Sequence, residues 1–195
     1  MSEEPQVAEE KVYFLEKKEV FVDDFEAPGL ILAIGGGGEG VIGQLKGTQV
    51  VAIDPNIREL KGAVDGPLKV KMDAGDMQFL DASFGTATSF FTLMYIKGVE
   101  HEKVFKEVYR VLAPQGRFLV WDVNLPTCLD ETKEFVALYL NIKLPDRDIE
   151  TGYGIKWPAQ VQNLAHYIRL AESVGFVISE QKDDGQTFFL ELQKP

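Results

Sequence analysis

The sequence is poor in the residues that build disulfide bridges and soft metal sites. Cys128 is the single cysteine among 195 residues, so no disulfide bridge can form within one chain. One cysteine and two histidines also disfavour a zinc site of the histidine and cysteine type. We therefore predict no metal centre, and we expect the reducing environment of the cytoplasm, where disulfide bridges are rare.

Long hydrophobic runs are absent as well. No apolar stretch reaches the ~18 residues that a membrane-spanning helix needs. The first residues, MSEEPQVAEE, lack the basic and apolar regions of a signal peptide. We therefore expect no membrane partner, and we interpret residues 1–11 as a flexible tail.

Positive charge is in short supply. The chain has 20 lysine and arginine residues against 31 acidic residues, which gives a net charge of −11. A strongly acidic surface repels phosphate groups, so nucleic acid is disfavoured as a partner. The expected partner is a small-molecule substrate.

The chain does contain the alternation of a globular α/β protein, and residues 12–195 have the length of a single domain. Apolar runs predict strands at 30–34, 49–54, 68–72, 86–93 and 117–123, followed by a hairpin of 176–182 and 187–193. Helical spacing predicts short helices ending near Leu45 and over 56–63, and longer ones over 101–112 and 158–174. This order predicts an α/β fold, a doubly wound, mostly parallel, seven-stranded Rossmann-like sheet with an antiparallel last strand.

One segment, 124–157, is extra to this alternation. Apolar residues alternate strictly over 134–144, and 153–157 can return as the partner strand, which indicates an inserted β-hairpin. Such a hairpin serves either as a lid over a substrate or as an edge that pairs two subunits into a homodimer. The sequence leaves both interpretations open.

The strongest chemical signal is the glycine-rich stretch that runs from Gly35 to Gly40 between a buried strand and a helix. Glycines at such a turn let a ligand approach the backbone closely, here at Gly35, Gly36 and Gly37. Asp54 ends the next strand, where a carboxylate can accept hydrogen bonds from both ribose hydroxyls of an adenosine. Loop and acid together fit either NAD or S-adenosylmethionine.

The order of five segments resembles class I S-adenosylmethionine-dependent methyltransferases, from about Leu30 to the C-terminus. The resemblance is carried by LILAIGGGGEG, VVAIDP, MDAGDMQFLDASFGTATSFF, EVYRVLAPQGRFLVWD, and ESVGFVISEQ with TFFLEL. It implies S-adenosylmethionine as cofactor, with the methionine part near the glycine loop, Asp54 and Pro55 at the ribose, Asp73 and Ala74 at the adenine, and Ser89 and Phe90 beside the sulfonium.

The chain also departs from the family pattern at three positions. Ala33 stands where many members have an acid that helps to hold the cofactor's amino group. Gly85 stands where an aspartate is usual, and Gln115 replaces a common glycine. Loss of the acid at position 33 predicts weaker cofactor binding, so a binding protein without turnover stays open.

Candidates for a catalytic base are Asp122, which ends the fifth strand, His101 and Tyr95, with Tyr153 in the insertion as a further one. A sulfonium methyl group is already activated, so alignment of the reacting atoms is the first requirement and a base is needed only for acceptors of high pKa. The leading hypothesis is methyl transfer from S-adenosylmethionine to a small molecule. The alternatives are a catalytically silent S-adenosylmethionine-binding or dimerising protein and an NAD-dependent oxidoreductase.

Overall fold

The computed structural model describes residues 8–125 and 132–195, and the chain divides into two compact units. The larger unit comprises residues 25–125 and 162–195, and the smaller one comprises residues 1–24 and 126–161. Each is described by itself below. Residues 1–7 of the expected tail lie outside the described residues, and Glu9–Lys11 form a single 3-10 turn, η1.

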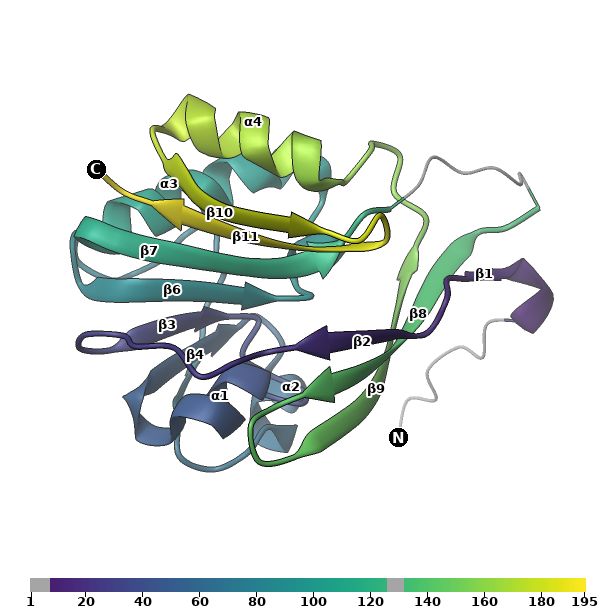
Figure 1. Cartoon of the computed structure of the whole chain (residues 1–195), viewed down its shortest axis with the longest axis horizontal. Coiled ribbons are helices and arrows are strands. Elements are labelled where there is room, and N and C mark those ends of the chain that lie inside the picture. The colour runs from purple at the N-terminus through teal and green to yellow at the C-terminus, as the bar shows by residue number, and fades with distance from the viewer. Residues whose placement is uncertain (1–7, 126–131) are drawn as a thin grey trace. The chain divides into compact units, whose positions relative to one another are not determined.

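The larger unit is built on a seven-stranded sheet in the order β10-β11-β7-β6-β3-β4-β5 (Figure 1). The strands are β3 (Ile31–Ile34), β4 (Val50–Asp54), β5 (Leu68–Lys71), β6 (Phe84–Phe90), β7 (Leu112–Val123), β10 (Val177–Asp183) and β11 (Thr187–Gln193). Neighbouring strands from β5 to β7 are parallel, and β11 is antiparallel to β7. The predicted seven-stranded, Rossmann-like sheet with an antiparallel last strand is therefore confirmed.

Helices connect the parallel strands as expected. They are α1 (Val41–Lys46), α2 (Ile57–Gly62), α3 (His101–Val111) and α4 (Leu164–Val174), with 3-10 turns η2 (Gly47–Gln49), η3 (Leu93–Tyr95) and η4 (Gly98–Glu100). The chain moves one way along the sheet from β3 to β5 and the other way from β6 to β7. Because such crossovers are right-handed, α1 and α2 lie on one face of the sheet and α3 lies on the other.

Three predicted boundaries in the larger unit are wrong by three residues or more. The fifth predicted strand begins at Leu112 rather than at residue 117. The last helix begins at Leu164 rather than at residue 158, because the side chain of Asn163 accepts a hydrogen bond from the amide of His166 (2.9 Å) and caps the helix there. The fourth predicted strand ends at Phe90 rather than at residue 93, because Phe91 has a positive φ of 44° that strand geometry does not allow.

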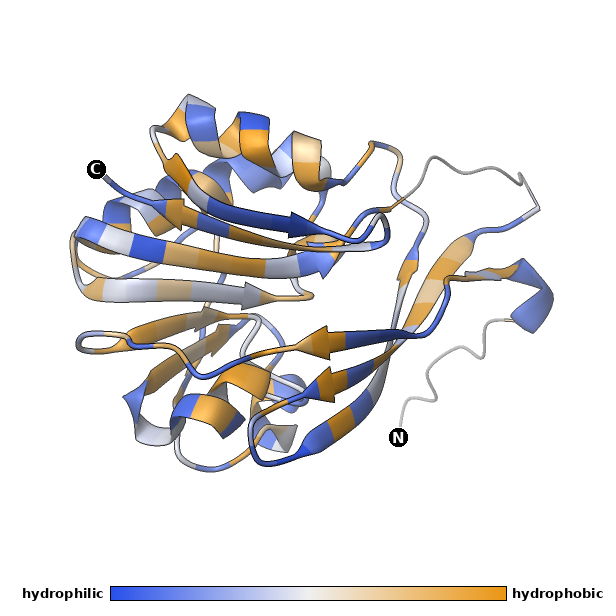
Figure 2. Cartoon of the chain, viewed as in Figure 1, coloured by the Kyte–Doolittle hydropathy of each residue, from blue (hydrophilic) through white to orange (hydrophobic). Residues whose placement is uncertain are grey.

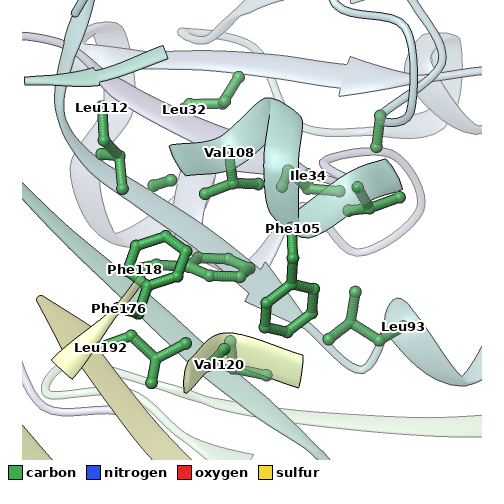
Figure 3. Close-up of a cluster of buried hydrophobic side chains, with 14 of the residues drawn as sticks. Leu32, Ile34, Leu93, Phe105, Val108, Leu112, Phe118, Val120, Phe176 and Leu192 are labelled. Atoms are coloured by element: carbon green, nitrogen blue, oxygen red, sulfur yellow. The ribbon is translucent and has the colours of Figure 1, made fainter. Parts of the chain in front are cut away.

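The core of the larger unit lies between the sheet and the helices α3 and α4. Leu32, Ile34 and Val120 of the sheet pack in one cluster with Phe105 and Val108 of α3 (Figure 3). Spacing of three and four residues along α3 directs its apolar side chains to this single face. β10 is by contrast mainly hydrophilic, as suits a strand at the edge of a sheet (Figure 2).

The smaller unit is a four-stranded sheet of β1 (Val12–Phe14), β2 (Lys18–Phe21), β8 (Phe135–Lys143) and β9 (Asp148–Lys156). β8 and β9 form the predicted hairpin, with Lys143 opposite Asp148. The returning strand is longer than the predicted 153–157, because the amide of Leu144 bonds the carbonyl of Arg147 (2.9 Å) and closes a short turn. β1 and β2 pair in parallel with β8, which joins the segment before the larger unit to the inserted one.

Candidate cofactor-binding site

The carboxyl ends of five strands meet at one edge of the larger sheet, since β5, β4, β3, β6 and β7 are parallel. The chain leaves β3 toward β4 and leaves β6 toward β7, so the direction of winding reverses between β3 and β6. Ligands of open α/β sheets bind at this reversal, outside the carboxyl ends of the strands. The glycine-rich loop follows β3 at this point.

The loop after β3 is packed tightly against its neighbours. A Cβ atom on Gly35 would lie 2.2 Å from Oγ1 of Thr92, and one on Gly36 would lie 2.7 Å from Cβ of Ala52. The amide of Gly36 also donates to the carbonyl of Ile53 (3.1 Å). Any side chain larger than hydrogen at Gly35 or Gly36 would therefore push the loop away from the turn after β6 or from β4, while residues 35–39 stay half-exposed.

Asp54 lies beside this loop, as the sequence predicts. Its Oδ2 would be 2.9 Å from a Cβ atom on Gly37, and its Oδ1 accepts a hydrogen bond from the amide of Asn56 (2.7 Å). The side chain is half-buried, and Pro55 after it is exposed. The structure thus brings the glycine loop and the carboxylate together at the carboxyl ends of β3 and β4.

Asp73 and Ala74 follow β5 at the same edge. The amide of Met72 donates to the carbonyl of Asp54 (3.2 Å), so the end of β5 is tied to the end of β4. Asp73 is exposed, and its Oδ1 accepts from the amide of Gly75 (2.7 Å), whereas Ala74 is buried in the core. One carboxylate oxygen of Asp73 therefore shapes the turn.

Ser89 and Phe90 are the last residues of β6, and both are buried. Among the described residues, the Ser89 hydroxyl has no hydrogen-bond partner. The ring of Phe90 packs against those of Phe91 (centroids 5.0 Å apart) and Trp121 (6.0 Å). Phe90 is therefore part of an aromatic cluster at the end of β6.

Thr92 is a residue at this edge that sequence reasoning missed. Its Oγ1 is 3.1 Å from the carbonyl oxygen of Phe90 and 3.3 Å from that of Ile34, so it bridges β6 to the start of the glycine loop. Phe91 before it has a left-handed backbone, which costs about 1–3 kcal/mol in a residue other than glycine. No pattern in the sequence marks this strained turn.

The three proposed catalytic residues differ sharply in exposure. Tyr95 is 52% exposed, whereas the side chains of His101 and Asp122 are fully buried. Tyr153 lies in β9 of the smaller unit. Of the candidates in the larger unit, Tyr95 alone presents its side chain to solvent.

Asp122 lies in a nest of backbone amides near the end of β7. Its carboxylate accepts from the amides of Val123 (2.8 Å) and Met94 (3.3 Å). Complete burial raises the pKa of Asp122 to about 7, although the amides of residues 92–94 favour the charged form and oppose the rise.

His101 begins α3 and pairs with a second histidine. Its Nδ1 is 3.0 Å from Nε2 of His166 on α4, and its Nε2 is 3.1 Å from the carbonyl oxygen of Leu93. Burial lowers the pKa of both histidines, so their neutral forms are favoured.

The structure shows the local environment of each of the three residues that depart from the family pattern. Ala33 is buried in β3 between Ala52 and Thr88 of the neighbouring strands. Gly85 leaves room for Pro28, whose carbonyl oxygen would lie 2.6 Å from a Cβ atom at position 85. Gln115 has a positive φ of 63°, the conformation that a glycine would adopt without strain.

Comparison with known proteins finds a family model that matches the segment forming most of this edge. A family model described as a methyltransferase domain matches residues 32–120, which run from β3 into β7. The sterol 4-C-methyltransferase strm-1 of Caenorhabditis elegans is 36% identical over an alignment of 80 residues, and the match covers 37% of this chain and 23% of that protein. The match thus spans about a quarter of that relative's length.

Solved structures share the fold at low sequence identity. A SAM-dependent methyltransferase from Methanosarcina mazei superimposes with a TM-score of 0.63 at 16% identity, covering 87% of this chain and 94% of that one. Phosphoethanolamine N-methyltransferase 2 of Haemonchus contortus, solved in complex with S-adenosyl-L-methionine, gives 0.64 at 16% identity, covering 88% of this chain and 50% of that one. At such identities the likeness concerns the fold.

Two further observations concern residues 8–125 and 132–195. No cluster of three or more histidine, cysteine, aspartate or glutamate side chains suited to a metal ion occurs within these ranges. None of their helices has the length and apolar character needed to cross a membrane.

Proposed function

We propose that this chain, which belongs to the class I S-adenosylmethionine-dependent methyltransferases, transfers a methyl group from S-adenosylmethionine to a small-molecule acceptor. The observation that supports this most is the position of Asp54. Its carboxylate lies against Gly37 at the place where the winding of the sheet reverses. A ribose bound by Asp54 would also contact the backbone of the glycine loop.

The residues at this edge fit the chemistry of the cofactor. Asp54 offers Oδ2 to the ribose hydroxyls, since its Oδ1 already accepts from Asn56. Asp73 offers its second oxygen to the exocyclic amine of adenine, beside Ala74. Residues 35–37 would lie along the methionine part, with Pro55 flanking the nucleoside and Ser89 and Phe90 toward the sulfonium.

The chemistry asks mainly for alignment. S-adenosylmethionine supplies a methyl group on a positively charged sulfur, which keeps the electron pair of the breaking bond when an acceptor takes the methyl group. The acceptor atom, the methyl carbon and the sulfur must lie on one line. The loop at Gly35 and the turn at Thr92, which touch each other, would hold the sulfur in its place on this line. Tyr95 follows β6 in η3, is 52% exposed, and is the candidate base for acceptors that must lose a proton.

The acceptor is proposed as a small uncharged or cationic molecule. The net charge of −11 disfavours nucleic acid as the acceptor. The relative from C. elegans is described as acting on a sterol, which makes sterols the first acceptors to assay with this chain.

Two alternatives have an observation in their favour. Ala33 is buried and has no acid to offer to the cofactor, which favours a silent S-adenosylmethionine-binding protein. β8 pairs with β9 on one side and with β1 and β2 on the other, so a homodimer through the inserted hairpin would pair along β9. The ribose-binding carboxylate also fits NAD, which favours an oxidoreductase. The homodimer is checked by measuring the molar mass in solution.

Thermal unfolding with S-adenosylhomocysteine or NADH separates these functions. A ligand at a 100-fold excess over its Kd adds about 2.7 kcal/mol, and each kcal/mol raises the Tm of a chain this size by about 2–4 °C. We expect this stabilisation with S-adenosylhomocysteine and none with NADH.

The substitution Asp54→Ala is expected to remove most of the shift because the ribose loses its acceptor. Asp65→Ala is the matched control, since Asp65 is an exposed aspartate in the loop before β5, at the amino ends of the strands, and the variant is expected to leave the shift unchanged. A full shift in Asp54→Ala would show that the ribose assignment is wrong, and stabilisation by NADH alone would favour the oxidoreductase.

A further inference from the structure

Buried side chains hold the turn after β6 from two sides. Asp122 of β7 accepts hydrogen bonds from the amide of Met94 and from its own neighbour Val123, and the amides of Thr92 and Leu93 also stabilise its charged form. The amides of residues 92–94 belong to one short turn, η3 and the residue before it. The carboxylate therefore fixes the N–H side of this turn.

His101 holds the other side of the same turn. A carbonyl oxygen can only accept, so the contact of His101 Nε2 with the carbonyl of Leu93 (3.1 Å) requires the proton on Nε2. In the neutral ring Nδ1 is then an acceptor, and Nε2 of His166 donates to it across 3.0 Å. The second histidine thus selects the tautomer that lets His101 bind Leu93.

The held turn touches the glycine loop. Leu93 packs beside Phe105 in the core, which Figure 3 shows. Thr92, one residue earlier, lies so close to Gly35 that the loop has no room for a Cβ atom, and its hydroxyl reaches the carbonyl of Ile34. Because one peptide bond joins Leu93 to Thr92, a shift of Leu93 would move Thr92 and would therefore act on Gly35.

We propose that Asp122 and His101 are positioning residues that hold the peptide groups around Leu93, keep Thr92 against Gly35, and so set the shape of the loop that receives the methionine part of the cofactor. This inference rests on the proposed function, because it assigns the loop to that ligand. Neither side chain then serves as a catalytic base, since both are buried and already bonded to the backbone.

The charged form of Asp122 is the stronger acceptor for amides, so the hold weakens when this carboxylate takes up a proton near pH 7. The groups that face the cluster from other elements are His101 of α3 and His166, Tyr167 and Arg169 of α4. The pKa of Tyr167 is raised, the pKa values of both histidines are lowered, and arginine stays charged. Asp122 is therefore the member of this cluster that changes charge around neutral pH.

The test measures the affinity for S-adenosylhomocysteine by calorimetry from about pH 6 to about pH 8.5. We expect the wild-type affinity to fall roughly fivefold to tenfold as the pH is lowered, with a midpoint near 7. Asp122→Asn keeps the shape but has no charged form, so it should show the weaker affinity at every pH.

Hydrogen exchange gives a second readout that needs no ligand. Asp122→Asn should increase exchange of the amides at 92–94 and leave those of β3 and β4 unchanged. His101→Leu removes the donor to Leu93 and should do the same, whereas His101→Asn retains an N–H donor and should restore part of the protection. Thr86→Val is the matched control for a change in the buried sheet, since the buried Thr86 hydroxyl has no hydrogen-bond partner within residues 8–125 and 132–195.

The outcomes are distinct. A pH step that persists in Asp122→Asn, or exchange that rises equally in β3 and β4, would overturn the positioning role. A wild-type protein that does not bind S-adenosylhomocysteine would contradict the proposed function, and the positioning role would then be decided by hydrogen exchange of the unliganded variants alone.

Discussion

At the scale of single residues, the departure from the family pattern at Gln115 has a physical consequence, which is backbone strain. The sequence marks it as a residue in place of a common glycine, and the structure gives it a left-handed backbone with a φ of 63°. Its side chain makes one exposed hydrogen bond, from Gln193 (3.2 Å), which is worth little in water. The strain is therefore a local cost to stability and has no visible connection to the cofactor site.

Gln115→Gly is accordingly expected to stabilise the protein. A left-handed residue with a Cβ atom costs roughly 1–2 kcal/mol, and the greater freedom of glycine in the unfolded chain offsets about half of the gain. The net increase of about 0.5–1 kcal/mol should appear in urea-induced unfolding. Gln193→Ala, which removes only the side-chain contact, is the control, and a destabilised Gln115→Gly would show that this contact outweighs the strain.

Asp122 also predicts a pH dependence of stability. Its pKa is about 7 in the folded chain and 3.8 ordinarily, so between these values the folded state holds a proton that the unfolded state releases. The contribution of this group to stability therefore declines as the pH rises through this window and is constant above it. His101 and His166 act in the opposite sense, because the unfolded chain takes up their protons below about pH 6.5.

Asp122→Asn should abolish the decline that is due to the carboxyl group. The comparison is the free energy of unfolding of wild type and variant at about pH 5 and about pH 8, because the histidine contribution cancels in their difference. The difference should favour the variant more at the higher pH. A difference that is equal at both pH values contradicts the raised pKa of Asp122.

At the scale of elements, the glycine loop packs against its neighbours and also has the proposed role in binding the cofactor. The same absence of side chains that exposes its backbone lets Gly36 lie against Ala52 of β4 and Gly35 against Thr92. The loop therefore takes its shape from β4 and from the turn after β6 as well as from its own sequence. A change in either neighbour acts on the proposed cofactor site.

Gly36→Ala tests this coupling. Its Cβ atom would lie 2.7 Å from Cβ and 3.0 Å from Cα of Ala52, contacts that backbone movement alone can relieve. We expect a loss of about 1–3 kcal/mol in stability and loss of the thermal shift with S-adenosylhomocysteine. Gly62→Ala in α2 is the control and should be neutral or slightly stabilising, because a Cβ atom there would have no atom from outside its helix within 4 Å in the described part of the chain. Unchanged binding by Gly36→Ala would show that the loop tolerates movement.

At the scale of the whole molecule, the strand order explains why residues far apart in the chain form one candidate site. Asp54, Asp73, Ser89 and the glycine loop lie at or just beyond the carboxyl ends of four different strands, and their shared edge comes from the parallel pairing of those strands. The smaller unit joins residues 12–21 to the inserted hairpin through β8. Its part in binding an acceptor or a second subunit stays a prediction.

The sequence by itself determined the seven-stranded α/β fold, the closing hairpin and the places of the glycine loop, Asp54 and Asp73. These depend on local signals, since hydrophobic periodicity, glycine clusters and the residue at the end of a strand are readable within a few positions. The tertiary structure alone decided the burial of His101 and Asp122, the contact of Thr92 with Gly35, and the pairing of β1 and β2 with β8. Each of these depends on segments that lie far apart in the chain. The environment that such segments create around a side chain cannot be inferred from its neighbours in the sequence.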